Sequence, residues 1–292
     1  MHIITTPQIA VDDVLHAVRS AFLDLSQHGD DLAPQTVIPL PADGDVIAYP
    51  AVLPSAGTGV FSMKLSPYLP QATGAPIVTA WTILLSLETG DPIALINSSA
   101  LTAERTAATS VLAVEALHDG PVKRAAVIGL GPLGAAHARY LHHIWPEAEI
   151  VGYSRSSGGS AGLTRAASVE AAVEDADAVL LCTSAAADVI DPRLLAPGVV
   201  VTSISTNAAG AREIPAEAVK DLDVYVDDAR TPEIAAELRD AKELGWDGSN
   251  VRGTLAQLLG GSAQAPSGDR VAYFRSVGLG LEDAAVAWAA LA

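Results

Sequence analysis

The sequence predicts an α/β protein in which a doubly wound parallel sheet of the Rossmann type is joined to a second, α+β domain. An apolar, β-rich run at 125–128 leads into a glycine-rich turn at 129–134 that opens a helical pattern. Strand-like and helical runs alternate from there to residue 244. Short strand patterns, separated by proline and glycine, fill residues 35–97. Alternation of this kind is typical of a parallel sheet, whereas consecutive short strands indicate an antiparallel unit.

The first part of the chain predicts one helix followed by short strands. The helical pattern covers 11–25. A long alanine-rich helix, with Thr102 as its N-cap, then leads into the next domain and should link the two. The expected strands between these helices are 35–40, 46–49, 59–65, 77–87 and 92–97.

The glycine turn predicts a dinucleotide site. Gly129 permits the tight turn, Gly131 lets a pyrophosphate approach the backbone, and Gly134 lets the helix lie close to the strand. Pro132 suits a first helical turn, where its missing N–H has no partner to lose. A second strand at 149–153 follows where a βαβ unit requires it. The N-terminus of the helix would then face the anion.

The residues after that second strand favour NADPH over NADH. An NAD site usually places an acidic residue there to hold the ribose 2′-hydroxyl, but this chain has Ser154, Arg155 and Ser156. Arg155 can pair with a 2′-phosphate, and the serines are further donors. Glu149 lies at the wrong end of the strand to replace the acid. The expected cofactor-binding residues are Gly129, Gly131, Pro132, Leu133, Gly134, Ser154, Arg155, Ser156 and Thr183.

The remainder of the chain continues the alternation. A Ser/Gly-rich run at 156–163 leaves little room before the next helix, so one βα element should be short. The final segment, 271–292, predicts a strand and a helix that could rejoin the first domain. The other expected elements are a helix at 168–174, strands at 178–183, 199–204 and 224–227, and a helix at 232–244.

Composition excludes several classes of function. The 292 residues include 34 acidic and 17 basic ones, a net charge of −17, with no basic cluster. Such a surface repels nucleic acid and anionic membranes. Apolar runs stay below the roughly 18 to 20 residues of a membrane helix, and no leader segment is evident, so we expect a cytoplasmic protein. Cys182 is the only cysteine, which leaves no disulfide framework and no thiolate metal site.

Two cations stand where a charge is unusual. Lys64 interrupts an apolar strand, and Arg105 lies in the first turns of an alanine-rich helix. Both could grip an anionic substrate, or they could be ordinary solvated side chains at a sheet edge and on a helix surface. The chain has no HExxH, GxSxG or Cys/His cluster, so we expect no metal, and a cofactor-dependent enzyme is the best-supported class.

Three ordered motifs resemble the ornithine cyclodeaminase/μ-crystallin family. They are 90–110, the glycine turn and 274–283, and the resemblance spans nearly the whole chain. It implies a dimerising substrate domain built from both chain ends and an NAD(P)-binding Rossmann domain. The expected boundaries are 1–118 with 270–292 for the first and 119–269 for the second. It also implies that Lys64 lies beside the substrate carboxylate and imine, and that Arg105 grips the carboxylate.

The chain departs from this family at positions that handle protons and charge. In the cyclodeaminases an aspartate in the loop after the fifth strand handles the amine protons, and Asn207 takes its place here. An amide cannot cycle a proton near neutral pH as a carboxylate can, which disfavours cyclodeamination. Gln35 and Ile47 stand where the family has a second arginine and a glutamate. Such a site suits an enzyme that only transfers hydride to a preformed imine.

The predicted function is NADPH-dependent reduction of a C=N bond next to a carboxylate. The expected substrate is a cyclic ketimine, Δ1-pyrroline-2-carboxylate or Δ1-piperideine-2-carboxylate, which would give a proline- or pipecolate-type imino acid. Arg105 would orient the carboxylate, Lys64 would polarise or protonate the imine, and Asn207 would donate a hydrogen bond nearby. The expected partners are this small molecule and a second copy of the chain in a homodimer.

Three alternatives stay open. An open-chain amino-acid or opine-type dehydrogenase would use the same residues. An ornithine or lysine cyclodeaminase would release ammonia. A μ-crystallin-like protein would bind NADPH and a small ligand with little turnover.

Overall fold

The structure of the protein is a computed structural model that describes residues 1–28, 32–41, 43–73, 77–155, 163–204 and 210–291. The chain divides into two compact units. Unit 1 is Met1–Arg105 with Leu279–Ala292, and unit 2 is Thr106–Gly278. Among the described residues, none of the helices combines the length and the hydropathy needed to cross a bilayer.

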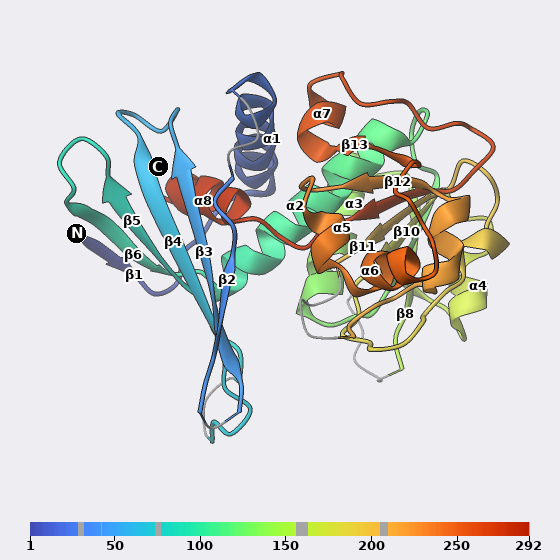
Figure 1. Cartoon of the computed structure of the whole chain (residues 1–292), viewed down its shortest axis with the longest axis horizontal. Coiled ribbons are helices and arrows are strands. Elements are labelled where there is room, and N and C mark those ends of the chain that lie inside the picture. Colours follow the sequence, from blue (N-terminus) through green and yellow to red (C-terminus); the bar gives the residue numbers. More distant parts are fainter. Residues whose placement is uncertain (29–31, 42, 74–76, 156–162, 205–209, 292) are drawn as a thin grey trace. The chain divides into compact units, whose positions relative to one another are not determined.

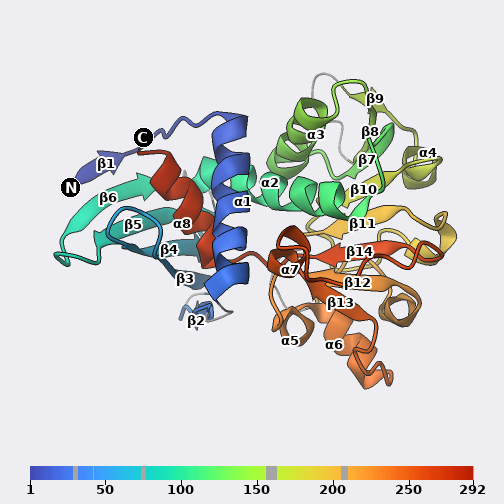
Figure 2. The same cartoon turned by 90° about the horizontal axis from the view of Figure 1, so that it is seen from above.

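Unit 1 is a six-stranded sheet with helices from both ends of the chain. The strand order is β1-β6-β5-β4-β3-β2, with β1 parallel to β6 and the other neighbours antiparallel. Helix α8 packs against β3, β4, β5 and α1 (Figures 1 and 2). The elements are β1 (His2–Ile4), α1 (Val11–His28), β2 (Thr36–Pro39), β3 (Asp45–Leu53), β4 (Val60–Tyr68), β5 (Trp81–Ser86), β6 (Pro92–Asn97) and α8 (Gly280–Ala289).

The five strand-like runs of the first part all form strands, and two details differ from expectation. Strand β1, too short to show a periodic pattern, adds in parallel to β6, so the sheet is mixed. Helix α2 (Ser99–Leu117) begins before Thr102. The Thr102 hydroxyl donates to the carbonyl of Ser98 (3.0 Å), so Thr102 lies inside the first turn and is not the N-cap.

Unit 2 contains an eight-stranded sheet in which every pair is parallel, which confirms the doubly wound class. The order is β13-β12-β14-β11-β10-β7-β8-β9. In β10, β11 and β14 every residue is buried, as expected for strands that are covered on both faces. The strands are β7 (Arg124–Ile128), β8 (Glu149–Tyr153), β9 (Thr164–Arg165), β10 (Ala178–Leu181), β11 (Val200–Ser203), β12 (Asp223–Val226), β13 (Val251–Thr254) and β14 (Ala272–Arg275).

The helices of unit 2 follow the predicted alternation with one interruption. The helix expected at 232–244 is broken at Ala235, whose backbone is extended (φ −67°, ψ 129°). Helix α4 has five residues, in line with the short βα element expected there. The helices are α3 (Pro132–Ile144), α4 (Val169–Val173), α5 (Thr231–Ile234), α6 (Ala236–Glu243) and α7 (Leu255–Leu259), with the 3₁₀ turns η1 (Pro192–Leu194) and η2 (Ala216–Asp221).

The division of the chain differs from the expected boundaries. Strand β14 pairs with β11 and β12, so it belongs to unit 2, and only α8 returns to unit 1. Residues 106–118 likewise fall in unit 2, where Ala107, Val111 and Val114 are fully buried. A linking helix is shared between two cores, so its sequence pattern alone does not mark where one core ends.

Candidate active site

The glycine turn of unit 2 has the geometry that the sequence predicts. Gly129 has a φ of +98°, and a Cβ there would lie 2.6 Å from the carbonyl oxygen of Cys182. A Cβ on Gly134 would lie 1.8 Å from the carbonyl oxygen of Gly129. Side chains are therefore excluded at both positions. Gly131, the N-cap of α3, is different, because a Cβ there would meet nothing within 4 Å. The N-terminus of α3 is thus open to a ligand.

A cavity of about 630 Å³ lies at this turn. That size, with the open helix N-terminus, fits a dinucleotide. Gly134 is not among the lining residues, and a Cβ there would meet the Gly129 carbonyl and the Val127 side chain. Ser156 lies outside the described residues. The lining includes seven of the expected cofactor residues, Gly129, Gly131, Pro132, Leu133, Ser154, Arg155 and Thr183.

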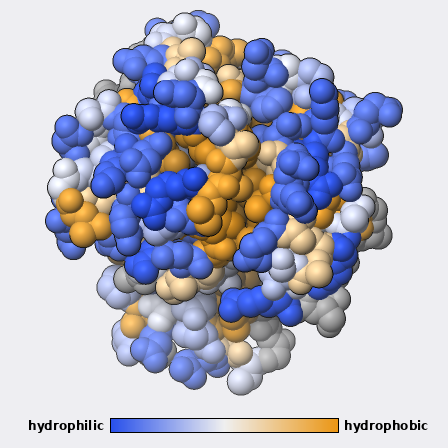
Figure 3. Space-filling model, turned by 90° about the vertical axis from the view of Figure 1, so that its right-hand side faces the viewer, coloured by the Kyte–Doolittle hydropathy of each residue, from blue (hydrophilic) through white to orange (hydrophobic). Residues whose placement is uncertain are grey.

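A larger hollow of about 1020 Å³ lies between α4 and the segment around η1. Figure 3 shows a hollow of this kind on one face of the molecule, with apolar residues at its floor and hydrophilic residues around it. Its charged lining includes Glu170, Glu174 and Asp191, and Asp191 pairs with Arg193. It lacks the glycine turn, and the N-terminus of α4, which borders it, is already capped, because the Ser168 hydroxyl accepts a hydrogen bond from the Ala171 N–H (3.2 Å). Of the two cavities, the smaller one therefore has the features that a dinucleotide site needs.

Two arginines lie near the end of β8. Arg155 is exposed and lines the cavity. Arg165, which the sequence analysis missed, lies on β9 opposite Gly152, and its Nη2 donates to the carbonyl of Ser154 (3.2 Å). Glu149 forms an ion pair with Arg124 instead of facing the cavity. Arg165 was missed because its approach to β8 depends on the pairing of β9.

Glu213 fixes one wall of the cavity at the glycine turn. It is fully buried, and its Oε1 accepts hydrogen bonds from the backbone N–H and the hydroxyl of Thr183, both at 2.7 Å. Its Oε2 accepts one from the Ser203 hydroxyl, also at 2.7 Å. Burial raises the pKa of Glu213, although these hydrogen bonds oppose the rise. The carboxyl group thus ties the residues that follow β10 to the end of β11 and fixes Thr183.

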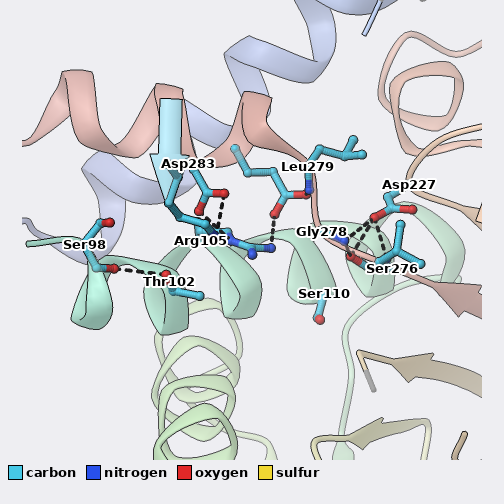
Figure 4. Close-up of polar contacts among 12 residues, drawn as sticks. Ser98, Thr102, Arg105, Ser110, Asp227, Ser276, Gly278, Leu279 and Asp283 are labelled. Carbon is cyan, nitrogen blue, oxygen red and sulfur yellow. Dashed lines mark hydrogen bonds and ion pairs between the residues drawn. The ribbon is translucent and has the colours of Figure 1, made fainter. Parts of the chain in front are cut away.

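Lys64 and Arg105 lie together in unit 1, and both are buried, with exposed fractions of 1% and 6%. Neither is an ordinary solvated side chain, which was the second interpretation of the sequence. Lys64 Nζ lies 2.8 Å from Asp283 Oδ2 and 4.1 Å from the centroid of the Tyr49 ring. Arg105 Nε lies 3.1 Å from Asp283 Oδ1, and its Nη1 lies 2.9 Å from Glu282 Oε2 (Figure 4). We call these five residues the charged cluster.

Strand register places the charged cluster on one face of the sheet. Tyr49 on β3 is directly opposite Lys64 on β4, so their side chains share a face. Helix α8 packs against these strands and supplies the two acids. Ile47 lies two residues before Tyr49 on β3 and therefore shares this face. The position where the family has a glutamate is thus on the same side of the sheet as Lys64.

Burial and neighbouring charges act differently on the two cations. Burial lowers the pKa of Lys64, and the Asp283 carboxylate only partly offsets this effect. Burial also acts to lower the pKa of Arg105, but the carboxylates of Asp283 and Glu282 outweigh it and raise that pKa. Arg105 is therefore a permanent cation, while Lys64 gives up its proton more readily than an exposed lysine.

Glu282 and Asp283 were not among the predicted site residues, although both stand in the C-terminal motif. Two acids in the first turn of a helix are also what the helix dipole favours, so they gave no distinct signal. Asn207, the third expected catalytic residue, lies outside the described residues.

Comparison with known proteins places the chain in a family. The sequence model described as ornithine cyclodeaminase/mu-crystallin family matches residues 4–291. The NAD(P)H-dependent anabolic L-arginine dehydrogenase DauB of Pseudomonas aeruginosa is 44% identical, over 94% of this chain and 90% of that protein. The Delta(1)-pyrroline-2-carboxylate/Delta(1)-piperideine-2-carboxylate reductase of Azospirillum brasilense is 26% identical, over 96% and 91%.

A solved structure shares the fold. It is that of Thermococcus litoralis Delta(1)-pyrroline-2-carboxylate reductase with NADH and L-proline, with a TM-score of 0.88. The two chains are 23% identical, and the match covers 99% of this chain and 96% of that one. With the family match over nearly the full length, these findings confirm the resemblance seen in the sequence: the chain belongs to the ornithine cyclodeaminase/μ-crystallin family.

Proposed function

We propose that this chain uses NADPH to reduce a C=N bond next to a carboxylate. It is an NAD(P)H-dependent oxidoreductase of CH–NH and C=N bonds. The observation that carries the finer proposal is the charged cluster, because it buries a lysine and an arginine together in one unit. A buried arginine suits a carboxylate, and a buried lysine of lowered pKa suits an imine nitrogen that must be protonated.

The residues of unit 2 fit the cofactor. Bound there, a nicotinamide dinucleotide supplies the hydride. The backbone N–H groups of Gly131 and Leu133, with the helix dipole at the start of α3, would hold the pyrophosphate, while Pro132, which has no N–H, starts the helix. Arg155 would pair with the 2′-phosphate, with Ser154 as a further contact. The preference for NADPH over NADH rests on Arg155 and on the lack of an acid at the end of β8.

The residues of unit 1 would bind and polarise the substrate. Arg105 would orient the carboxylate, and Lys64 Nζ would donate a proton or a hydrogen bond to the imine nitrogen. Asn207 would add a hydrogen bond. The charged cluster holds two cations and two carboxylates, so an anionic substrate has to compete with Asp283 and Glu282 for the cations.

The comparisons favour an open-chain substrate over a cyclic one. The relative that is 44% identical over nine-tenths of both chains is named for L-arginine, whereas the relative named for cyclic ketimines is 26% identical. We therefore propose the imine of a 2-oxo acid with a long side chain as the first candidate. The cyclic ketimine is the second candidate. It is supported by Asn207 and Ile47, which stand where the family has acidic residues, because a cyclodeaminase would need such acids whereas reduction of a preformed imine would not.

The test measures the loss of NADPH absorbance with each substrate of a panel. The panel contains the 2-oxo acid of arginine with ammonia and the two cyclic ketimines, and each assay is repeated with NADH in place of NADPH. Turnover of the 2-oxo acid of arginine supports the open-chain substrate. Turnover of the ketimines alone makes the cyclic ketimine the first candidate instead. Ammonia release from ornithine or lysine with NAD would indicate a cyclodeaminase. Tight NADPH binding without turnover would favour a μ-crystallin-like binding protein.

We also propose that the chain is a cytoplasmic homodimer. Unit 1 exposes large apolar side chains, and such surfaces commonly mark protein interfaces. Light scattering of the purified protein tests the mass, and a monomer would contradict the proposal. The exposed apolar residues of unit 1 include Val37, Ile38, Val52, Leu65, Ile77, Val78 and Leu87.

A further inference from the structure

We propose that Asp283 is a positioning residue, which sets the place of both Lys64 and Arg105 and holds the lysine in its protonated form for the reaction. The inference rests on the proposed function, since it assigns Lys64 the same task. What is new is that the protonation of Lys64 is controlled from the C-terminal helix.

The geometry supports a single carboxylate shared by two cations. Asp283 Oδ2 lies 2.8 Å from Lys64 Nζ, and its Oδ1 lies 3.1 Å from Arg105 Nε. The three residues come from β4, α2 and α8, so they are far apart in the sequence. Because each oxygen serves a different cation, a change at Asp283 alters the position of both.

The first turn of α8 is held in place by contacts other than the ion pair of Asp283 with Lys64. A Cβ on Gly280 would lie 2.5 Å from the carbonyl oxygen of Pro50, so the helix starts in close contact with β3. Glu282 Oε1 accepts a hydrogen bond from the Leu279 N–H (3.1 Å). The backbone that carries Asp283 is therefore set in place independently of Lys64, as a positioning role requires.

Stability alone is a poor explanation for the charged cluster. Four charged side chains with exposed fractions of 6% or less lie together. Removing such groups from water is costly, and replacing buried ion pairs by apolar residues is often neutral or stabilising. A cluster of this kind is better explained by chemistry that needs a cation held at a defined point.

The protonation of Lys64 depends on groups from three elements. Asp283 and Glu282 of α8 favour the charged amine, Arg105 of α2 disfavours it, and the ring of Tyr49 on β3 lies over it. Without the Asp283 charge, burial and Arg105 both act to deprotonate the amine. If the reaction needs a protonated lysine, activity should then be lost at a lower pH.

The experiment is the pH profile of kcat/KM for Asp283→Asn, with Glu282→Gln as the matched control. Both variants remove one carboxylate from the first turn of α8, but only Asp283 contacts Lys64. We expect the alkaline limb of Asp283→Asn to lie at least about one pH unit lower than in the wild type. Glu282→Gln should move it less, and Asp283→Glu should restore part of the change. An unmoved limb in Asp283→Asn would overturn the proposal.

A second measurement does not depend on turnover. Lysine labelled with ¹³C at Cε gives only four side-chain signals, because the chain has four lysines, and Lys64→Arg assigns the one of interest. The NMR titration midpoint of Lys64 should fall by about one pH unit or more in Asp283→Asn. An unchanged midpoint contradicts the role of Asp283 even if no imine is reduced. A lowered midpoint without turnover on any imine contradicts the proposed function alone.

Discussion

The glycine turn of unit 2 and the charged cluster of unit 1 are built in opposite ways. The turn depends on backbone conformation, and six consecutive residues, three of them glycines, define it. The charged cluster is made of side chains that meet only after folding, with Arg105 and Asp283 separated by 178 positions. The difference teaches that a binding surface for a common cofactor can be encoded locally, while the groups that define a particular reaction are assembled from distant segments.

The largest expected effect comes from a substitution in the charged cluster. Lys64→Ala should lower kcat by roughly 10²- to 10⁴-fold, the usual contribution of a positioned acid or base. NADPH binding, measured by fluorescence titration, should survive because the turn lies in the other unit. Unchanged kcat would remove Lys64 from the mechanism. Since Asp283 keeps Arg105 as a partner, the substitution should cost less stability than the roughly 3–5 kcal/mol expected when a buried charge loses its sole partner, which thermal unfolding will report.

The turn should respond to side-chain volume according to position. Gly134→Ala places a methyl group 1.8 Å from the Gly129 carbonyl, so the turn must distort, and NADPH affinity should fall by roughly tenfold to a hundredfold. Gly131→Ala is the matched control for folding, because nothing lies within 4 Å of its methyl group. It should leave the melting temperature unchanged while raising the KM for NADPH. Equal melting temperatures for both variants would contradict this account.

Acid should weaken the core of unit 2 through His137. Its Nδ1 donates to the carbonyl of Leu133 (2.7 Å) and its Nε2 lies 2.9 Å from the Ser110 hydroxyl. Burial lowers the pKa of His137 from 6.5 to about 4. The unfolded chain therefore binds the proton more tightly, and about 3 kcal/mol of stability present above pH 6.5 is lost as the pH falls toward 4. The free energy of unfolding, measured in urea, should differ less between pH 7.5 and pH 5 in His137→Gln than in the wild type.

The smallest expected effect concerns the choice between cofactors. Arg155→Ala should reduce the preference for NADPH over NADH by roughly tenfold, the size of one charge-assisted hydrogen bond. Arg165→Ala tests whether the arginine beside Ser154 contributes to the same preference. The ratio of kcat/KM for the two cofactors is the quantity to compare. A ratio that stays constant in both variants would mean that neither arginine reads the 2′-phosphate.

The sequence predicted the parts of the molecule whose information is local. The glycine turn, the doubly wound sheet and the short α4 follow from consecutive residues, and all three are present. Strand β14 was expected to rejoin the first domain, because periodicity shows that a strand forms and not which sheet it joins. The break at Ala235 was missed because helical residues lie on both sides of it.

The candidate site was predictable only in part for the same reason. Lys64 and Arg105 stood out as charges in apolar surroundings, and both are buried. Their carboxylate partners had no such signal, since acids at the start of α8 are ordinary in a surface helix. Glu213 was also overlooked, because an acid after a loop gives no sign of the three hydrogen bonds it accepts.

The most direct test of the account is the rate of NADPH oxidation by the wild type and by Lys64→Ala with the 2-oxo acid of arginine plus ammonia and with the two cyclic ketimines. The account predicts rapid oxidation by the wild type with at least one of these substrates, and a loss of at least about a hundredfold in Lys64→Ala at undiminished NADPH affinity. Equal rates for the two proteins, or no oxidation with any of the substrates despite bound NADPH, would contradict it.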